Sequence, residues 1–115
     1  MNGNHLYLIE NHHGDIKVGV STSPQKRLKS LELAGNFDII KKFIIPTKFA
    51  RKFEKMVFIK FANYRVRGEW FTGIEFETMQ TYIFDEFSAF TPNHDLSDIP
   101  DSEVLRLVEK VLYDN

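Results

Sequence analysis

Residues 5–31 read HLYLIENHHGDIKVGVSTSPQKRLKSL, and this stretch decides the fold. It begins with two apolar runs, residues 5–10 and 15–20, which are separated by the turn-forming residues Asn11 to Gly14. Two short apolar runs on either side of such a turn predict a β-hairpin.

A helix is expected directly after the hairpin. Ser23 can cap free N–H groups at a helix start, and Pro24 suits the first helical position because it has no N–H to leave unpaired. Gly35 is the expected stop at the other end. These signals predict a helix over residues 24–34.

The rest of the chain predicts one further strand and three more helices. Residues 37–45 are rich in Ile and Phe and end before Pro46, as a strand does. Apolar residues at helical spacing predict helices at 48–62, 74–88 and 101–113, with a basic loop at 64–68. The order β-β-α-β-α-α-α predicts an α/β (α+β) fold, with a three-stranded antiparallel or mixed sheet flanked by helices. Residues 1–90 are expected to form the main domain, and 91–115 an acidic linker and C-terminal helix packed on it.

Composition excludes several kinds of site. The chain has 115 residues, which suits one domain, and it contains no cysteine, so disulfides, cysteine-based zinc sites and thiol nucleophiles are ruled out. His12 and His13 are neighbours in the turn and lack the helical spacing of a metal-binding pair. No signal peptide or long apolar run is visible, so we expect a soluble, intracellular and cytoplasmic protein without membrane contact.

Charge is distributed unevenly along the chain. Residues 17–67 contain 13 Lys or Arg and three acids, whereas residues 68–115 contain two bases and 11 acids. A basic middle segment is typical of phosphate binding. Three alternatives remain: the two halves attract each other within the fold, the acidic segment restricts access to the basic one, or the acidic segment is itself the working surface.

Five motifs in order resemble the GIY-YIG nuclease superfamily. Leu6-Tyr7 stands at the end of the first family motif, and Lys17-Val18-Gly19 stands at the second. Arg27 follows Gly19 by eight residues, Glu54 lies on the next long helix, and the tail reads Arg-Gly-Glu-Trp-Phe at 67–71. The resemblance covers residues 5–71 and is to a branch common in phages and large DNA viruses.

The resemblance implies a metal-dependent endonuclease that hydrolyses DNA. In it, Arg27 stabilises the charge of the phosphate and Glu54 holds Mg²⁺ or Mn²⁺. Both roles agree with chemistry, because Arg grips phosphate with paired hydrogen bonds and one carboxylate can hold an Mg²⁺ that keeps water and phosphate ligands. The plain alternatives are an exposed helix Arg and an ion pair of Glu54 with Arg51.

Tyr7 and Lys17 are the remaining catalytic candidates. Tyr7 would orient or deprotonate the attacking water, or would pack as a core residue. Lys17 replaces the Tyr that is usual in the second motif, and it would act as a base or as a phosphate clamp. The alternative function is therefore a nucleic-acid-binding module of the same fold with weakened or lost catalysis.

The hairpin register decides whether these two residues can cooperate. A four-residue turn at 11–14 would pair Tyr7 with Val18 and place Tyr7 and Lys17 on opposite faces of the sheet. Both reach one site only if the register shifts by one residue or a bulge intervenes. We expect such a shift.

Other side chains are candidates for contacts with substrate. A nucleic-acid track is predicted from Lys26, Lys41, Lys42, Arg65 and Arg67, each of which is otherwise a solvated base. Glu69 is expected either to support the metal or to serve in packing and capping. The expected partner is nucleic acid, DNA more than RNA, with a protein partner as one source of specificity. The expected state is a monomer or weak dimer, in the host cytoplasm if the protein is viral.

Overall fold

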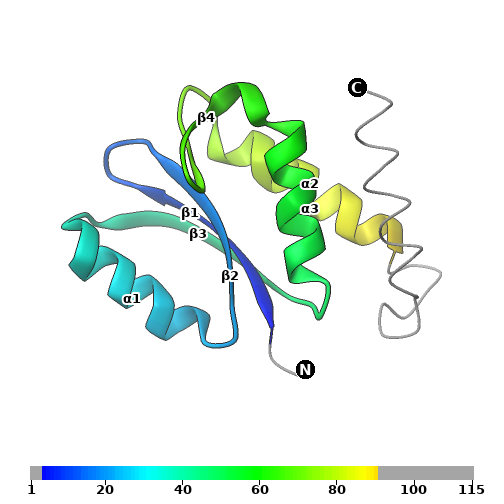
Figure 1. The fold of residues 1–115 in the computed structure, drawn as a ribbon, viewed down its shortest axis with the longest axis horizontal. Helices are drawn as coiled ribbons and strands as arrows, with labels where there is room; N and C mark the ends of the chain where they lie inside the picture. The colour runs from blue at the N-terminus through cyan, green and yellow to red at the C-terminus, as the bar shows by residue number, and fades with distance from the viewer. Residues whose placement is uncertain (1–3, 91–115) are drawn as a thin grey trace.

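A computed structural model of the chain describes residues 4–90. Figure 1 shows one sheet with helices on both sides. In chain order the elements are β1 (His5–Asn11), β2 (Ile16–Ser21), α1 (Pro24–Gly35), β3 (Ile39–Pro46), α2 (Ala50–Lys60), the short 3-10 helix η1 (Ala62–Tyr64), β4 (Arg65–Arg67), β5 (Trp70–Phe71) and α3 (Phe76–Phe90). The predicted helix at 101–113 and the predicted segment 91–115 lie outside the described residues.

The sheet has five strands in the order β3-β1-β2-β5-β4, and each neighbouring pair is antiparallel. The predicted α+β class is confirmed, but two strands are added to the three expected. The predicted basic loop at 64–68 is instead half of a hairpin made by β4 and β5, which turns at Gly68 with a φ of 53°. Strands of three and two residues are too short to show an alternating pattern in a sequence.

The β1–β2 hairpin has the shifted register that was expected. Asn11 N–H donates to the Asp15 carbonyl, so three residues rather than four connect the strands, and Gly14 takes a φ of 85°. Such three-residue connections need a left-handed residue at this place, which suits glycine. Tyr7 therefore pairs with Gly19, and Ile9 with Lys17. Because residues two apart on a strand share a face, Tyr7 and Lys17 lie on the same side of the sheet.

The two faces of the sheet carry separate cores. On one face Tyr7 and Ile9 pack with Leu28 of α1. The other face carries the larger core, to which β1, β2, α2 and α3 contribute, and Figure 1 shows α2 and α3 on the side away from α1. Strand β3 contains a bulge, because Glu10 of β1 pairs with Lys41 while Asn11 pairs with Ile39. The extra residue keeps the apolar Ile39 on the face that packs with α1.

The ends of α1 differ in detail from the prediction. Ser23 is the N-terminal capping residue, but its side chain makes no capping hydrogen bond. The Ser21 hydroxyl instead accepts the Ser23 N–H at 2.9 Å. At the other end the left-handed residue is Asn36, with a φ of 53°, one position beyond Gly35. Gly35 is required for another reason, since a Cβ there would overlap the ring of Phe37.

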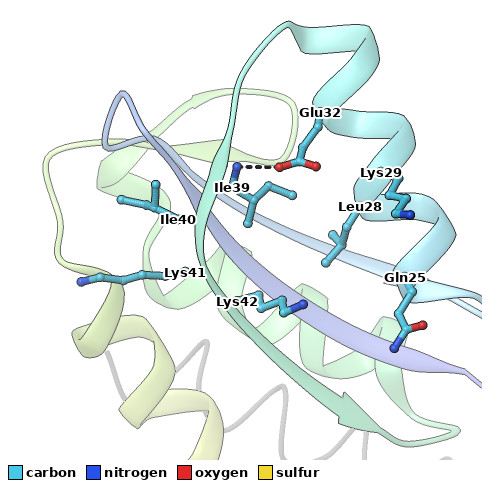
Figure 2. A pocket seen from close by; sticks show the side chains of 8 residues that line it. All are labelled: Gln25, Leu28, Lys29, Glu32, Ile39, Ile40, Lys41 and Lys42. Carbon is cyan, nitrogen blue, oxygen red and sulfur yellow. Dashed lines mark hydrogen bonds between the residues drawn. The ribbon is translucent and has the colours of Figure 1, made fainter.

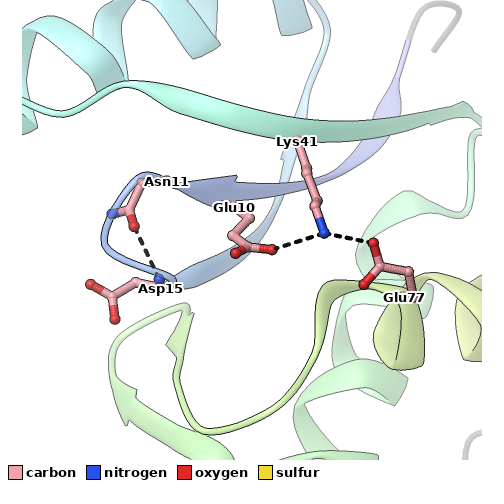
Figure 3. Close-up of polar contacts among 5 residues, drawn as sticks. All are labelled: Glu10, Asn11, Asp15, Lys41 and Glu77. Atoms are coloured by element: carbon pink, nitrogen blue, oxygen red, sulfur yellow. Dashed lines mark hydrogen bonds and ion pairs between the residues drawn. The ribbon is translucent and has the colours of Figure 1, made fainter.

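Helix α3 is tied to the sheet by a lysine. Lys41 of β3 donates to Glu77 of α3 at 2.7 Å and lies 3.9 Å from a carboxylate oxygen of Glu10 on β1, as Figure 3 shows. Exposed ion pairs of this kind contribute at most about 1 kcal/mol. The apolar residues Phe76, Met79 and Ile83, which are buried in the larger core, therefore supply most of the attachment of this helix.

Candidate active site

Tyr7 lies at the centre of the candidate site. Its side chain is only 1% exposed, and its ring lies flat against the backbone of Gly19 on the neighbouring strand. A Cβ at position 19 would overlap both the hydroxyl oxygen and the ring of Tyr7. Glycine is needed here because it leaves room for the aromatic ring, and not because of an unusual backbone angle.

Arg27 meets the hydroxyl of Tyr7 from α1. The Arg27 side chain is exposed, and its guanidinium is close enough to Tyr7 for hydrogen bonding and charge to act on the phenol. Burial raises the pKa of Tyr7 above its usual value, while this hydrogen bond and the charge of Arg27 act in the opposite direction. The negative charges of Glu69 and Glu54 also raise it. The phenol therefore keeps its proton at neutral pH, so it is a hydrogen-bond donor or an orienting group rather than a base.

Lys17 is buried and paired with Glu69. Its ammonium donates to Glu69 Oε1 at 2.9 Å and lies 5.5 Å from the centre of the Trp70 ring. The sheet imposes this neighbourhood, because Lys17 is the cross-strand partner of Trp70 on β5. Lys17 is thus a cation held in place beside the Tyr7 face. Of the two roles expected for Glu69, its contact with Lys17 gives it a structural one, and its half-exposed carboxylate faces the site.

Glu54 adds a second carboxylate from α2. Its side chain is buried, with 9% of its surface exposed. Burial raises the pKa of Glu54 to about 7, and the charge of Glu69 acts in the same direction, whereas Arg51 and Lys17 act against it. A buried carboxyl close to a second acid is stabilised by any cation that binds between or beside them. In the alternative interpretation Glu54 forms an ion pair with Arg51, but within residues 4–90 no salt bridge joins the two, and Arg51 acts only as a weaker opposing charge.

Strand β5 covers only part of the outer edge of β2. Helix α2 belongs to the larger core, whereas Tyr7 and Lys17 point to the α1 face. Strand β5 pairs with β2 only at Ile16 and Lys17, and the Val18 N–H then donates to the Glu69 carbonyl at 3.2 Å. Within residues 4–90 no strand covers the outer edge of β2 beyond that point. The charge of Glu54 acts on Tyr7, and the charges of Glu69 and Lys17 act on Glu54.

The five predicted substrate-binding residues do not form one track. Lys42 lies on the α1 face and lines a groove of about 360 Å³ between α1 and β3, together with Lys29 of α1 (Figure 2). Lys26 is exposed on α1 beside Arg27. Lys41 points to the other face, where its ammonium forms ion pairs with Glu77 and Glu10. Sequence reasoning did not select Lys29, although its place on the exposed side of α1 follows from helical spacing.

The remaining two basic residues lie on the β4–β5 hairpin. The Arg65 guanidinium stacks over the Phe58 ring at 4.9 Å and donates to the carbonyl of Gly68. Arg67 is exposed and lines a cavity with Trp70. Arg65 therefore stabilises its own hairpin, whereas Arg67 is available to a ligand next to the site.

The metal-binding capacity of the site is limited to carboxylates. Among the described residues no group of three or more His, Asp or Glu is placed to hold a metal ion. His12 has a structural role, since its Nδ1 accepts the Asp38 N–H at 3.0 Å. Glu54, with Glu69 nearby, is thus the place where a divalent cation would find oxygen ligands. No helix between residues 4 and 90 has the length and apolar character needed to cross a bilayer.

Comparison with protein families gives one match, to the T5orf172 domain, over residues 4–104. Comparisons with curated proteins and with solved structures found no match. The matched range contains Tyr7, Lys17, Arg27, Glu54 and Glu69, and so includes the whole candidate site. Membership supports a nuclease-like or DNA-binding module as the class of this protein. The chain belongs to the T5orf172 domain family, a phage-associated domain.

Proposed function

We propose that this protein is a metal-dependent endonuclease of the GIY-YIG type that hydrolyses phosphodiester bonds in DNA. The observation that carries the proposal is the hairpin register that puts Tyr7 and Lys17 on one face of the sheet, with the charges of Arg27 and Glu54 acting on Tyr7. Phosphodiester cleavage needs positive charge on the non-bridging oxygens and a cation near the reacting atoms. In this proposal Arg27 supplies the positive charge, and Glu54 is the group that would hold the cation.

Arg27 and Tyr7 act together on the phosphate. Arg27 is exposed and always charged, so it can form paired hydrogen bonds with two phosphate oxygens. Its guanidinium acts on the Tyr7 hydroxyl, so one phosphate could meet both groups. Tyr7, which keeps its proton, donates a hydrogen bond to a phosphate oxygen or to the attacking water.

Glu54 is the residue proposed to hold Mg²⁺ or Mn²⁺. Its raised pKa supports this role, because burial and Glu69 both disfavour the isolated carboxylate and a divalent cation would relieve that cost. A single carboxylate is enough for Mg²⁺ when water and substrate phosphate complete its shell. When bound, the ion would supply Lewis-acid stabilisation of the developing charge.

Lys17 motivates the second candidate function, a DNA-binding module without turnover. Lys17 takes the place of the usual Tyr and donates to Glu69, and burial raises the pKa of Tyr7, which argues against either side chain as the general base. In the endonuclease proposal the attacking water is deprotonated by solvent, and the rate rises with pH.

A plasmid-nicking assay distinguishes the two functions. We expect nicking of supercoiled DNA in Mg²⁺ or Mn²⁺, at least about a hundredfold slower for Arg27→Ala and Glu54→Gln. Asp85→Asn, on α3, is a matched charge control that should retain activity. DNA binding with no nicking in any divalent metal would reject the endonuclease and leave the binding module.

A further inference from the structure

A cavity of about 460 Å³ lies directly beside the candidate active site. It is bounded by the β1–β2 turn, the end of α1 and the β4–β5 hairpin. Trp70 belongs to both places, because it lines the cavity and its ring also lies 5.5 Å from the Lys17 ammonium. A group bound in the cavity would therefore be a neighbour of a phosphate bound at the site. Its volume falls within the range of about 300–1,000 Å³ that is common for small-molecule sites.

The walls of the cavity are aromatic and basic. Phe37 and Trp70 meet edge to face with their ring centres 5.5 Å apart, and both remain partly exposed. Arg67 lines the cavity from β4 and is exposed. Aromatic rings next to an Arg offer stacking to a flat ring and attraction to a phosphate.

Asn11 supplies a fixed hydrogen-bond donor at this cavity. The residue is only 3% exposed, and its Oδ1 accepts the N–H groups of His13 and Asp15, each at 3.0 Å. These two bonds fix which end of the amide is oxygen and leave the two side-chain N–H groups for a ligand. Figure 3 shows the amide nitrogen and the Asp15 carboxylate on the same side of the turn. Both residues line the cavity.

We propose that this cavity binds an unstacked guanine base of the nucleic acid held at the active site. The inference rests on the proposed function. Guanine presents one acceptor, O6, beside two donors, N1–H and the N2 amino group. The Asn11 amide donates to such an acceptor and the Asp15 carboxylate accepts from such donors. Adenine and cytosine offer the carboxylate only their exocyclic amino group, and thymine offers only its ring N3–H, so guanine alone presents two adjacent donor groups beside an acceptor. The preferred substrate is thus looped, mismatched or single-stranded rather than fully paired.

The test measures binding without metal, so it does not depend on cleavage. Three fluorescein-labelled duplexes of the same sequence are compared by anisotropy in EDTA: fully paired, with one bulged guanine, and with one bulged thymine. We expect the guanine bulge to bind about tenfold tighter than the other two. Trp70 is the only tryptophan in the chain, so its emission should be quenched by the guanine bulge alone.

Two isosteric variants test the recognition directly. Asn11→Asp keeps the oxygen that accepts the two backbone N–H groups but removes the donor, and Asp15→Asn replaces half of the acceptor with a donor. Both should abolish the ratio between bulged and paired duplex, while Asp85→Asn on α3 should preserve it. Thermal melting of each variant checks that it is folded. The ratio of affinities for bulged and paired duplex cancels any general effect of the changed charge on DNA binding.

The outcomes separate this inference from the proposed function. Salt-dependent binding with equal affinity for all three duplexes would overturn the base-binding cavity and leave the nuclease proposal standing. Equal gains for bulged guanine and bulged thymine would overturn the assignment of guanine. Absence of salt-dependent binding to every duplex would overturn both proposals.

Discussion

Gly19 and Tyr7 show how one residue in this protein restricts another. The ring of Tyr7 occupies the space that a side chain at position 19 would need. The resemblance to a nuclease motif singled out both residues, but only the register of the hairpin explains why they belong together. A glycine in a strand interior weakens the strand, so its presence here is explained by the packing of the tyrosine.

Gly19→Ala should displace the ring of Tyr7. We expect a loss of about 1–3 kcal/mol in stability from overpacking, and loss of nicking because the hydroxyl leaves Arg27. The double variant Tyr7→Leu/Gly19→Ala should recover most of the stability but none of the activity. Urea unfolding of the four proteins in this cycle measures the coupling. Additive effects would show that the two residues do not share the space.

Glu54→Gln should become more stable than the wild type as pH rises, because only the wild type loses stability. With a folded-state pKa of about 7 against an ordinary value near 4.5, Glu54 keeps a proton between these pH values that the unfolded chain releases. The wild type therefore loses stability as pH rises through this window, by about 1–3 kcal/mol, and the variant does not. Thermal melting at pH 4.5, 6 and 8 checks this. A constant difference between the two proteins across these pH values would contradict the assignment.

At the scale of elements, strand β3 carries two adjacent lysines with opposite surroundings. Both lysines line the groove of Figure 2, but the Lys41 ammonium is paired with Glu77 of α3, whereas Lys42 lies on the α1 side. Their neighbours in the sequence are alike, and alternation along the strand alone separates them. Of these two basic residues, Lys41 holds the fold together, and Lys42 remains a candidate for contact with a substrate.

Lys42→Ala should weaken DNA binding more than Lys41→Ala. Loss of one phosphate contact lowers the slope of log K against log salt by about one, so Lys42→Ala should show this change. Lys41→Ala should leave the slope unchanged and cost less than about 1 kcal/mol of stability, as expected for exposed pairs. Fluorescence anisotropy at four salt concentrations provides the measurement. The reverse order of effects would place the DNA on the α3 side.

For the whole molecule, the separation of charge along the chain is the leading feature. Residues 17–67 are strongly basic and residues 68–115 strongly acidic, yet the net charge is only −1. Within residues 4–90 some of this opposition is satisfied by contacts between segments, such as Lys17 with Glu69 and Lys41 with Glu77. The alternative in which the halves attract each other within the fold therefore accounts for part of the pattern.

Removal of acidic charge from the last segment should strengthen DNA binding. The triple variant Asp95→Asn/Asp98→Asn/Asp101→Asn raises the net charge by three, and we expect affinity to rise several-fold at low salt. The gain should vanish at high salt, because the Debye length then falls well below about 10 Å. Binding measured at two salt concentrations checks both statements. A gain that persists at high salt would point to a direct contact rather than to general repulsion.

The sequence by itself determined the α+β class, the β1–β2 hairpin and three described helices to within about two residues, whereas the candidacy of Arg27 and Glu54 rested on the resemblance to a nuclease family. Local signals sufficed, because turn residues and apolar periodicity act over a few positions. Such local signals did not predict the short strands β4 and β5. They also did not predict that Asn36, rather than Gly35, is the left-handed residue at the end of α1.

Only the tertiary structure decided which candidates share a site. The three-residue connection with Gly14 in the left-handed region sets the register that places Tyr7 and Lys17 on one face. The pairing of β5 with β2 at Lys17 makes Glu69 the partner of Lys17 across 52 positions of sequence. These contacts depend on chain segments that are distant in sequence. Their energies arise from burial and charge in the folded state, which no local pattern records.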